Sequence, residues 1–445
     1  MLEKDTLKDF LVAVDRLDAS FVNLPQFEPL IPGRERIAAV LNEAAGKLRD
    51  NYPYFHPLYA GQMLKPPHPV ARLAYSLAMW INPNNHALDG GRASSAMEKE
   101  AVAELAAMFG WKNHLGHLCS GGTFANLEAL WVAGRAHPGK KIAASSQSHY
   151  THERITAVLQ LPFESIPGDR FGRMDLDALE KQAQRGDIGT VVATMGATAT
   201  GAVDPLPGIL NLREKYGFRV HADAAYGGYF TLANNLAVPA RAAFDRLSEV
   251  DSIVIDPHKH GLQPYGCGCI LFRDPAAGQY YKHESPYTYF SSGDLHLGEI
   301  SLECSRPGAT AVALWATQKL LPLAKGGEFA QGLAKGREAA LALHRALAND
   351  QRWIVGFEPE LDIVIYAPRA RDTQNISKSS REVFNEAAKR GLHLALAELP
   401  AKFFADSAPE LAAEAGTITS MRSVMMKPEH AEWLPQILAI LSEAL

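Results

Sequence analysis

The chain has few cysteines and no long apolar run, and each scarcity excludes a class of protein. Four cysteines among 445 residues cannot form the dense disulfide framework of a small secreted protein. No window of about 18 consecutive apolar residues occurs, so the sequence predicts no membrane-spanning helix. The first residues, Met1-Leu2-Glu3-Lys4-Asp5, lack the basic and then apolar layout of a signal peptide. We therefore expect a cytoplasmic protein.

An excess of charge of one sign is also lacking. The formal net charge is −5 and no basic patch is present, so we expect no nucleic-acid partner. Hydrophobic residues make up 47% and charged residues 21%, which is ordinary for a globular protein. No internal repeat or low-complexity stretch occurs. A chain of this length indicates one large domain with smaller additions.

Short apolar runs alternate with helical patterns in the middle of the chain. Strands are predicted at residues 115–119, 141–144, 190–194, 218–222, 252–255 and 269–272. This alternation predicts an α/β fold with a mostly parallel central sheet covered by helices. We expect an N-terminal helical segment over residues 1–84, a large domain over 85–324, and a small C-terminal α/β domain over 325–445.

Three predicted strands end in residues that can do chemistry. Lys259 follows the β-branched run at 253–255, Asp223 follows the strand at 218–222, and His149 follows the strand at 141–144. Most lysines lie in solvated loops, but a neutral lysine amine can attack a carbonyl and form a Schiff base. Because ligands bind at the carboxyl ends of parallel strands, we expect these three side chains to share one site.

A fourth strand end predicts an anion-binding site. Ser120, Gly121, Gly122 and Thr123 follow the apolar run at 115–119 and open a helical stretch. Glycines and hydroxyls at a helix N-terminus bind anions through backbone N–H groups and the helix dipole.

An aspartate paired with the pyridine nitrogen of pyridoxal phosphate (PLP) makes that ring an electron sink. We therefore expect PLP as the cofactor, with Asp223 at its ring.

A metal site is the other interpretation of the histidines. His149 and His152 have a helical i, i+3 spacing that could hold a metal ion. No thiolate or carboxylate cluster with known ligand spacing accompanies them. We therefore expect no metal.

Taken together, these motifs resemble the group II PLP-dependent decarboxylases of fold type I, the family of aromatic amino acid, glutamate and tyrosine decarboxylases. The order and spacing match over roughly residues 50–430 at the segments 120–123, 149, 193–198, 223–225 and 258–259. The resemblance implies that Lys259 holds PLP as a Schiff base, with His149 stacked on one ring face and Ala225 behind the other. It also implies cofactor contacts from Thr198 and His258, and a homodimer with a shared active site.

Other matches to this family are softer. Arg422 matches a position where several members hold an arginine near the substrate carboxylate, and His56 matches a segment at the mouth of the site. In the family a loop from the partner subunit brings a tyrosine that protonates Cα; Tyr287 and Tyr289 are the candidates here, with His258 as the alternative. The alternative is that Arg422 is an ordinary surface arginine and that Tyr287 and Tyr289 only pack against the protein surface. Gly308 could place an N–H group on a phosphate across the dimer interface.

The resemblance predicts decarboxylation of an L-amino acid to its amine and carbon dioxide. Three alternatives stay open. Ser305-Arg306-Pro307-Gly308 is similar to the sphingosine phosphate lyases, which break a carbon–carbon bond. An aldehyde-forming oxidative decarboxylase would need the loop tyrosine replaced, often by phenylalanine, and Phe290 leaves that open; aminotransferase chemistry would need a proton shuttle such as Lys259. The sequence does not name the substrate, although the aromatic-rich segment at 285–290 favours an aromatic or other sizeable amino acid.

Overall fold

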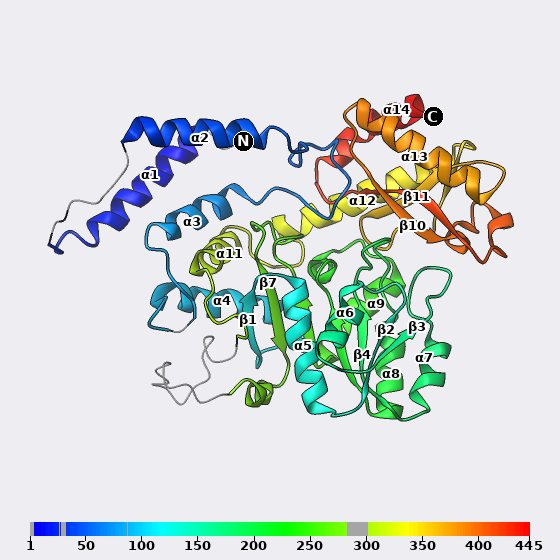
Figure 1. Cartoon of the computed structure of the whole chain (residues 1–445), viewed down its shortest axis with the longest axis horizontal. Coiled ribbons are helices and arrows are strands. Elements are labelled where there is room, and N and C mark those ends of the chain that lie inside the picture. Colours follow the sequence, from blue (N-terminus) through cyan, green and yellow to red (C-terminus); the bar gives the residue numbers. More distant parts are fainter. Residues whose placement is uncertain (1–3, 26, 28–32, 87, 283–300) are drawn as a thin grey trace.

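The computed structural model describes residues 4–25, 27, 33–86, 88–282 and 301–445 (Figure 1). Tyr287, Tyr289 and Phe290 lie outside the described residues. Across these ranges no helix is long and apolar enough to cross a membrane. The described chain forms a large sheet with helices on both faces, a smaller sheet near the C-terminus, and helices at the N-terminus that reach away from the rest (Figure 1).

The large sheet has seven strands in the order β1-β7-β6-β5-β4-β2-β3. Only β7 runs antiparallel to its neighbours, β1 and β6, so the predicted mostly parallel sheet is confirmed. The strands are β1 (Leu115–Cys119), β2 (Lys141–Ser145), β3 (Phe163–Ile166), β4 (Ile188–Thr194), β5 (Arg219–Asp223), β6 (Ser252–Ile255) and β7 (Gly268–Phe272). The sequence did not predict β3, a four-residue edge strand with polar residues at its centre.

Helices cover both faces because successive strand residues point to opposite sides. Val191 and Ile253 belong to a core shared with α4, α8 and α11, whereas Val192 and Val254 pack in cores shared with α5. The helices of this part are α4 (Arg92–Met108), α5 (Gly122–Ala136), α6 (Thr151–Val158), α7 (Leu176–Ala183), α8 (Leu206–Tyr216), α9 (Val238–Asp245) and α11 (Gly308–Leu320). Short 3-10 helices are η1 (Gly228–Leu232), η2 (Leu247–Glu249) and η3 (Pro275–Tyr280).

The C-terminal part is the small α/β unit that the sequence predicted. Its antiparallel sheet has the order β10-β11-β9-β8. The elements are α12 (Glu328–Ala348), β8 (Trp353–Val355), β9 (Ile363–Pro368), α13 (Thr373–Lys389), β10 (Ala395–Pro400), η4 (Ala401–Phe404), η5 (Pro409–Leu411), β11 (Thr417–Val424) and α14 (His430–Ala444). Ala60 joins this part, since its N–H donates to His393 O and its carbonyl accepts from Val424 N–H, both at 2.8 Å. The boundaries near residues 84 and 324 therefore remain predictions.

Three helices form the N-terminal segment: α1 (Lys4–Ala19), α2 (Arg34–Leu48) and α3 (Pro69–Met79). The helix α3 packs against α11. By contrast, α1 and α2 extend along the outside of the molecule (Figure 1), with Val14 the one buried residue of α1 and none buried in α2.

Sheet register brings the predicted functional residues to one edge. Thr194, the last residue of β4, pairs with Asp223, the last of β5, and Asp223 pairs in turn with Val254 of β6. Strands β2 and β4 are parallel neighbours as well. The loops that follow β2, β4, β5 and β6 therefore open at the same end of the sheet.

Candidate active site

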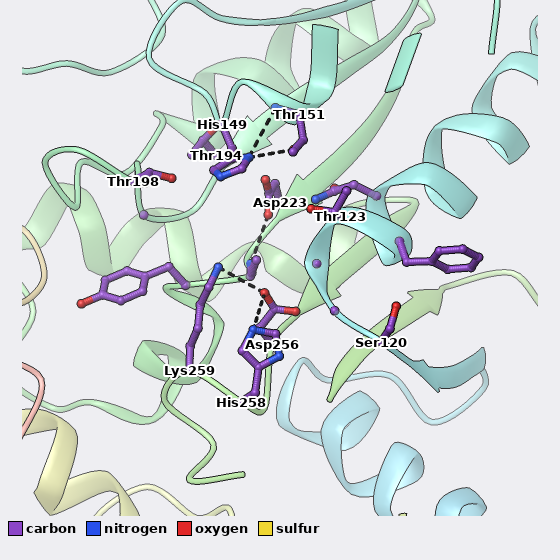
Figure 2. A pocket seen from close by; sticks show the side chains of 17 residues that line it. Ser120, Thr123, His149, Thr151, Thr194, Thr198, Asp223, Asp256, His258 and Lys259 are labelled. Atoms are coloured by element: carbon purple, nitrogen blue, oxygen red, sulfur yellow. Dashed lines mark hydrogen bonds and ion pairs between the residues drawn. The ribbon is translucent and has the colours of Figure 1, made fainter. Parts of the chain in front are cut away.

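A cavity of about 440 Å³ lies at this carboxyl edge. Figure 2 shows how Lys259, His149 and Asp223 approach it from separate elements. The structure brings most of the predicted site residues together here, namely Ser120, Gly121, Gly122, Thr123, His149, Thr198, Asp223, Ala225, His258 and Lys259. A site assembled from the ends of five strands, β1, β2, β4, β5 and β6, is the arrangement that a parallel sheet favours.

Lys259 lies in the turn after β6, and its amine faces a carboxylate. Its Nζ is 3.1 Å from Asp256 Oδ2, and the side chain is 20% exposed. Asp256 is buried, and its second oxygen, Oδ1, has no partner among the described residues. Sequence reasoning did not identify Asp256 as a partner of this lysine. The signal was nevertheless present, because Asp256 directly follows the predicted strand at 252–255 and precedes Lys259 by three residues.

Asp223 is held by two donors at the end of β5. Its Oδ2 is 2.8 Å from His152 Nε2, and its Oδ1 accepts the Ala225 N–H at 3.2 Å. Burial by itself raises the pKa of Asp223, but the hydrogen bond from His152, with the charge of Lys259 in support, lowers it to well below its usual value. An aspartate in this setting stays ionised across the neutral pH range.

His149 lies between β2 and α6, and its ring lines the cavity. Its Nδ1 is 2.8 Å from Thr151 Oγ1 and accepts the Thr151 N–H at 3.3 Å. Burial lowers the pKa of His149, so the ring is neutral near neutral pH. Because Nδ1 accepts a backbone N–H, the proton of the neutral ring resides on Nε2.

The N-terminus of α5 carries the residues for which the sequence predicted an anion cradle, and they line the cavity. Gly121 is the N-cap of α5 and Gly122 its first residue. A Cβ at Gly122 would lie 2.6 Å from Asp256 Oδ2, and a Cβ at Gly268 would lie 2.5 Å from the Cα of Gly121. Side chains are therefore excluded here, and the first backbone N–H groups of α5, which have no partner within the helix, remain accessible to an anion.

These residues fit PLP. The glycine cradle suits its phosphate, the ionised Asp223 suits a protonated ring nitrogen, and the Lys259 amine suits its aldehyde. Two buried polar atoms at the cavity, Thr194 Oγ1 and Asp256 Oδ1, also have no partner among the described residues. Such unsatisfied groups are costly in a native protein unless a ligand or water pairs with them.

Three predicted residues do not line this cavity. Arg422 on β11 is partly buried and donates to Thr198 O and to Gly61 O, each at 3.0 Å. It therefore contacts the backbone of Thr198, which lines the cavity, without lining the cavity itself. His56 packs its ring on Trp433, with the ring centroids 4.6 Å apart. Gly308 begins α11, and its N–H donates to Pro83 O at 2.8 Å. Their roles toward substrate or phosphate remain predictions.

The segment Ser305-Arg306-Pro307-Gly308 has a structural explanation. Arg306 is buried, and its Nη1 donates to Glu98 Oε1 at 2.6 Å and to Leu118 O at 2.9 Å. Its Nη2 donates to Asn85 O at 2.8 Å. The arginine thus ties the start of α11 to α4 and β1, which gives Arg306 a structural role.

Sequence reasoning missed His152, which it considered only as a metal ligand. The structure places it behind Asp223, fully buried. No group of three or more metal-ligating side chains occurs within the described ranges. A histidine three residues after His149 in the first turn of a helix was the available signal, but its partner lies 71 residues away in sequence.

The fold and this site define a PLP enzyme of fold type I. The chain belongs to the pyridoxal-dependent decarboxylase family, since the model of the pyridoxal-dependent decarboxylase conserved domain matches residues 52–368. It is 31% identical to an L-tyrosine decarboxylase of Enterococcus faecium, with 69% of this chain and 67% of the relative covered. It is 30% identical to an L-aspartate decarboxylase of Thermococcus kodakarensis, with 74% and 83% covered.

Solved structures share the fold across almost the whole chain. Oryza sativa TDC with PLP and tryptamine superposes with a TM-score of 0.79 at 18% identity, covering 99% of each chain. Mouse CSAD superposes with a TM-score of 0.78 at 20% identity, covering 98% of each chain. The protein is therefore a PLP-dependent carboxy-lyase acting on an amino acid, as the sequence predicted, and the carbon–carbon lyase alternative is not favoured.

Proposed function

We propose that the cavity at the carboxyl edge of the large sheet is the decarboxylation site, with Lys259 as the point of covalent attachment for PLP. The observation that carries this proposal is the convergence of Lys259, Asp223 and the α5 N-terminus on one cavity. When bound, PLP accepts the electrons left at Cα as carbon dioxide departs. Asp223 would hold the proton of the ring nitrogen, and His149 and Ala225 would contact the ring.

We infer that a side chain supplies the proton that replaces the carboxylate at Cα. His258 donates its Nδ1–H to Cys267 O at 2.9 Å, and burial lowers its pKa. In the neutral ring Nε2 then carries no proton to give. This arrangement supports a loop tyrosine, Tyr287 or Tyr289, as the donor in preference to His258.

An aromatic L-amino acid is the substrate class that we propose. Among the described residues that line the cavity, Lys259 is the only lysine or arginine. Its amine would be bonded to the cofactor and so could not pair with a substrate carboxylate. The second carboxylate of an acidic substrate would therefore find no cation there. Relatives named L-tyrosine decarboxylases, such as the one from Enterococcus faecium, support the same choice.

A substrate panel tests this proposal. Purified protein with added PLP would receive L-tyrosine, L-tryptophan, L-aspartate, L-glutamate and L-2,4-diaminobutyrate, with carbon dioxide, amine, aldehyde and ammonia quantified. We expect carbon dioxide and the matching amine, with kcat/KM for an aromatic substrate at least about a hundredfold above that for aspartate, because an unpaired buried charge costs several kcal/mol. Faster turnover of an acidic substrate would contradict the substrate class, and aldehyde with ammonia would indicate the oxidative reaction.

We also propose a homodimer in which α1 and α2 cover a second copy of the chain. These helices leave Leu11, Val12, Val40, Leu41 and Leu48 more than half exposed. Large contiguous apolar surfaces on a soluble protein mark sites of association. The free state of the four cysteines supports a reducing compartment, and we propose the cytoplasm.

Sedimentation velocity tests the dimer. We expect the full-length protein to sediment as a dimer, and Val40→Glu with Leu41→Glu to shift it towards monomer, because each charge would be buried in the interface. A control pair of charge changes on a helix of the small unit, Lys378→Glu with Arg381→Glu on α13, should leave the dimer intact. A monomeric wild-type protein at micromolar concentration would contradict the proposal.

A further inference from the structure

A buried histidine behind the cavity has one ring nitrogen engaged and one free. His152 belongs to the first turn of α6 and is 0% exposed. Its Nε2 lies 2.8 Å from Asp223 Oδ2, whereas its Nδ1 is buried and has no partner among the described residues. Asp223 lines the cavity and His152 does not. The side chain of the histidine therefore reaches the cavity lining through the aspartate.

The unequal surroundings of the two nitrogens determine the form of the ring. An ionised carboxylate only accepts hydrogen bonds, so Nε2 must carry a proton. A cationic ring would also place a proton on Nδ1, where no acceptor is present, and an unpaired buried donor is costly. The neutral ring with its proton on Nε2 satisfies both conditions. It donates one hydrogen bond to Asp223 and leaves the negative charge of the aspartate in place.

We propose that His152 is a positioning residue for the cofactor: its Nε2–H orients Asp223 and keeps that carboxylate ionised toward the ring nitrogen of PLP. This inference rests on the proposed function and adds a residue to it. The Ala225 N–H, at 3.2 Å from Oδ1, is the second support of the same carboxylate. Each oxygen of Asp223 thus accepts one hydrogen bond, and these two bonds restrict the orientation of the carboxylate that lines the cavity.

A second buried histidine–carboxylate pair provides a matched control. His117 Nε2 lies 2.6 Å from Glu128 Oε2, and its Nδ1 lies 3.0 Å from Leu118 O. Both residues are buried, and neither lines the cavity. Loss of His117 thus removes the same kind of contact without touching the proposed cofactor site.

The test compares His152→Leu, His152→Gln and His117→Leu by PLP titration, the absorbance of the bound cofactor, and thermal unfolding of the cofactor-free protein. We expect His152→Leu to weaken PLP binding roughly tenfold or more, because Asp223 loses its principal donor, and to shift the absorbance maximum. The Gln amide can donate from the position of Nε2, so His152→Gln should restore most of the affinity. His117→Leu should lower only the unfolding temperature.

A double-mutant cycle separates positioning from a general packing role. In an Asp223→Asn background, His152→Leu should weaken PLP binding no further, since the carboxylate on which it acts is gone. Additive losses in the cycle, or a His152→Leu protein with wild-type affinity and spectrum, would overturn the inference while leaving the proposed function intact. A wild-type protein without Lys259-dependent cofactor absorbance would instead overturn the proposed function, and this inference with it.

Ring nitrogen-15 shifts provide a readout that does not depend on the cofactor. In the cofactor-free protein, we expect His152 to show the neutral form protonated at Nε2. Shifts of a doubly protonated ring would overturn the inference, because they would make the contact a charge pair.

Discussion

Lys259→Ala should abolish decarboxylation and the visible absorbance of bound PLP together. The amine of Lys259 is the only lysine amine among the described residues that line the cavity, so its loss leaves the cofactor aldehyde without a covalent partner. We expect kcat/KM to fall at least about 10⁴-fold, as happens when the nucleophile of a covalent mechanism is removed. Absorbance after dialysis against buffer and carbon dioxide release from the preferred substrate measure the two effects.

A surface lysine provides the control for this change. Lys215 on α8 pairs with Glu180 at the protein surface, and Lys215→Ala should keep the spectrum and the rate. The cofactor-free Lys259→Ala protein should unfold at a lower temperature than the wild type, because the buried Asp256 carboxylate loses its ion-pair partner. Absorbance that survives dialysis in Lys259→Ala would place the attachment at another residue.

Asp223→Asn should separate cofactor attachment from catalysis. The amide keeps the shape of the carboxylate but loses the charge that holds a proton on the ring nitrogen, so PLP would withdraw electrons less strongly. We expect kcat to fall on the order of 10² to 10³-fold, the range for loss of one preorganised electrostatic group. Attachment at Lys259, seen as visible absorbance, should remain.

An aspartate at the amino end of β6, away from the carboxyl ends that form the site, is the matched control. Asp251 precedes β6 and accepts the Val220 N–H at 2.8 Å, and it does not line the cavity. Asp251→Asn should leave kcat unchanged, although it can lower stability. An Asp223→Asn protein that decarboxylates at the wild-type rate would refute the electron-sink role of Asp223.

The sequence by itself determined the fold class and the centre of the site. Both follow from local patterns, namely apolar runs of strand length, the helical stretches between them, and the polar residue that ends each run. The rule that parallel strands present their carboxyl ends at one edge then brings Lys259, Asp223 and Gly122 together without any knowledge of packing. The cofactor followed from these residue types, and the family followed from their order.

Only the tertiary structure decided which residues contact and orient the residues that line the cavity. His152 reaches Asp223 across 71 residues, and Arg422 reaches Thr198 across 224, and no local period encodes such contacts. The edge strand β3 was missed because sheet pairing, rather than intrinsic preference, stabilises short strands. Side-chain partners in a folded core depend on how whole elements pack, so the groups that orient the site were visible only once the chain was folded.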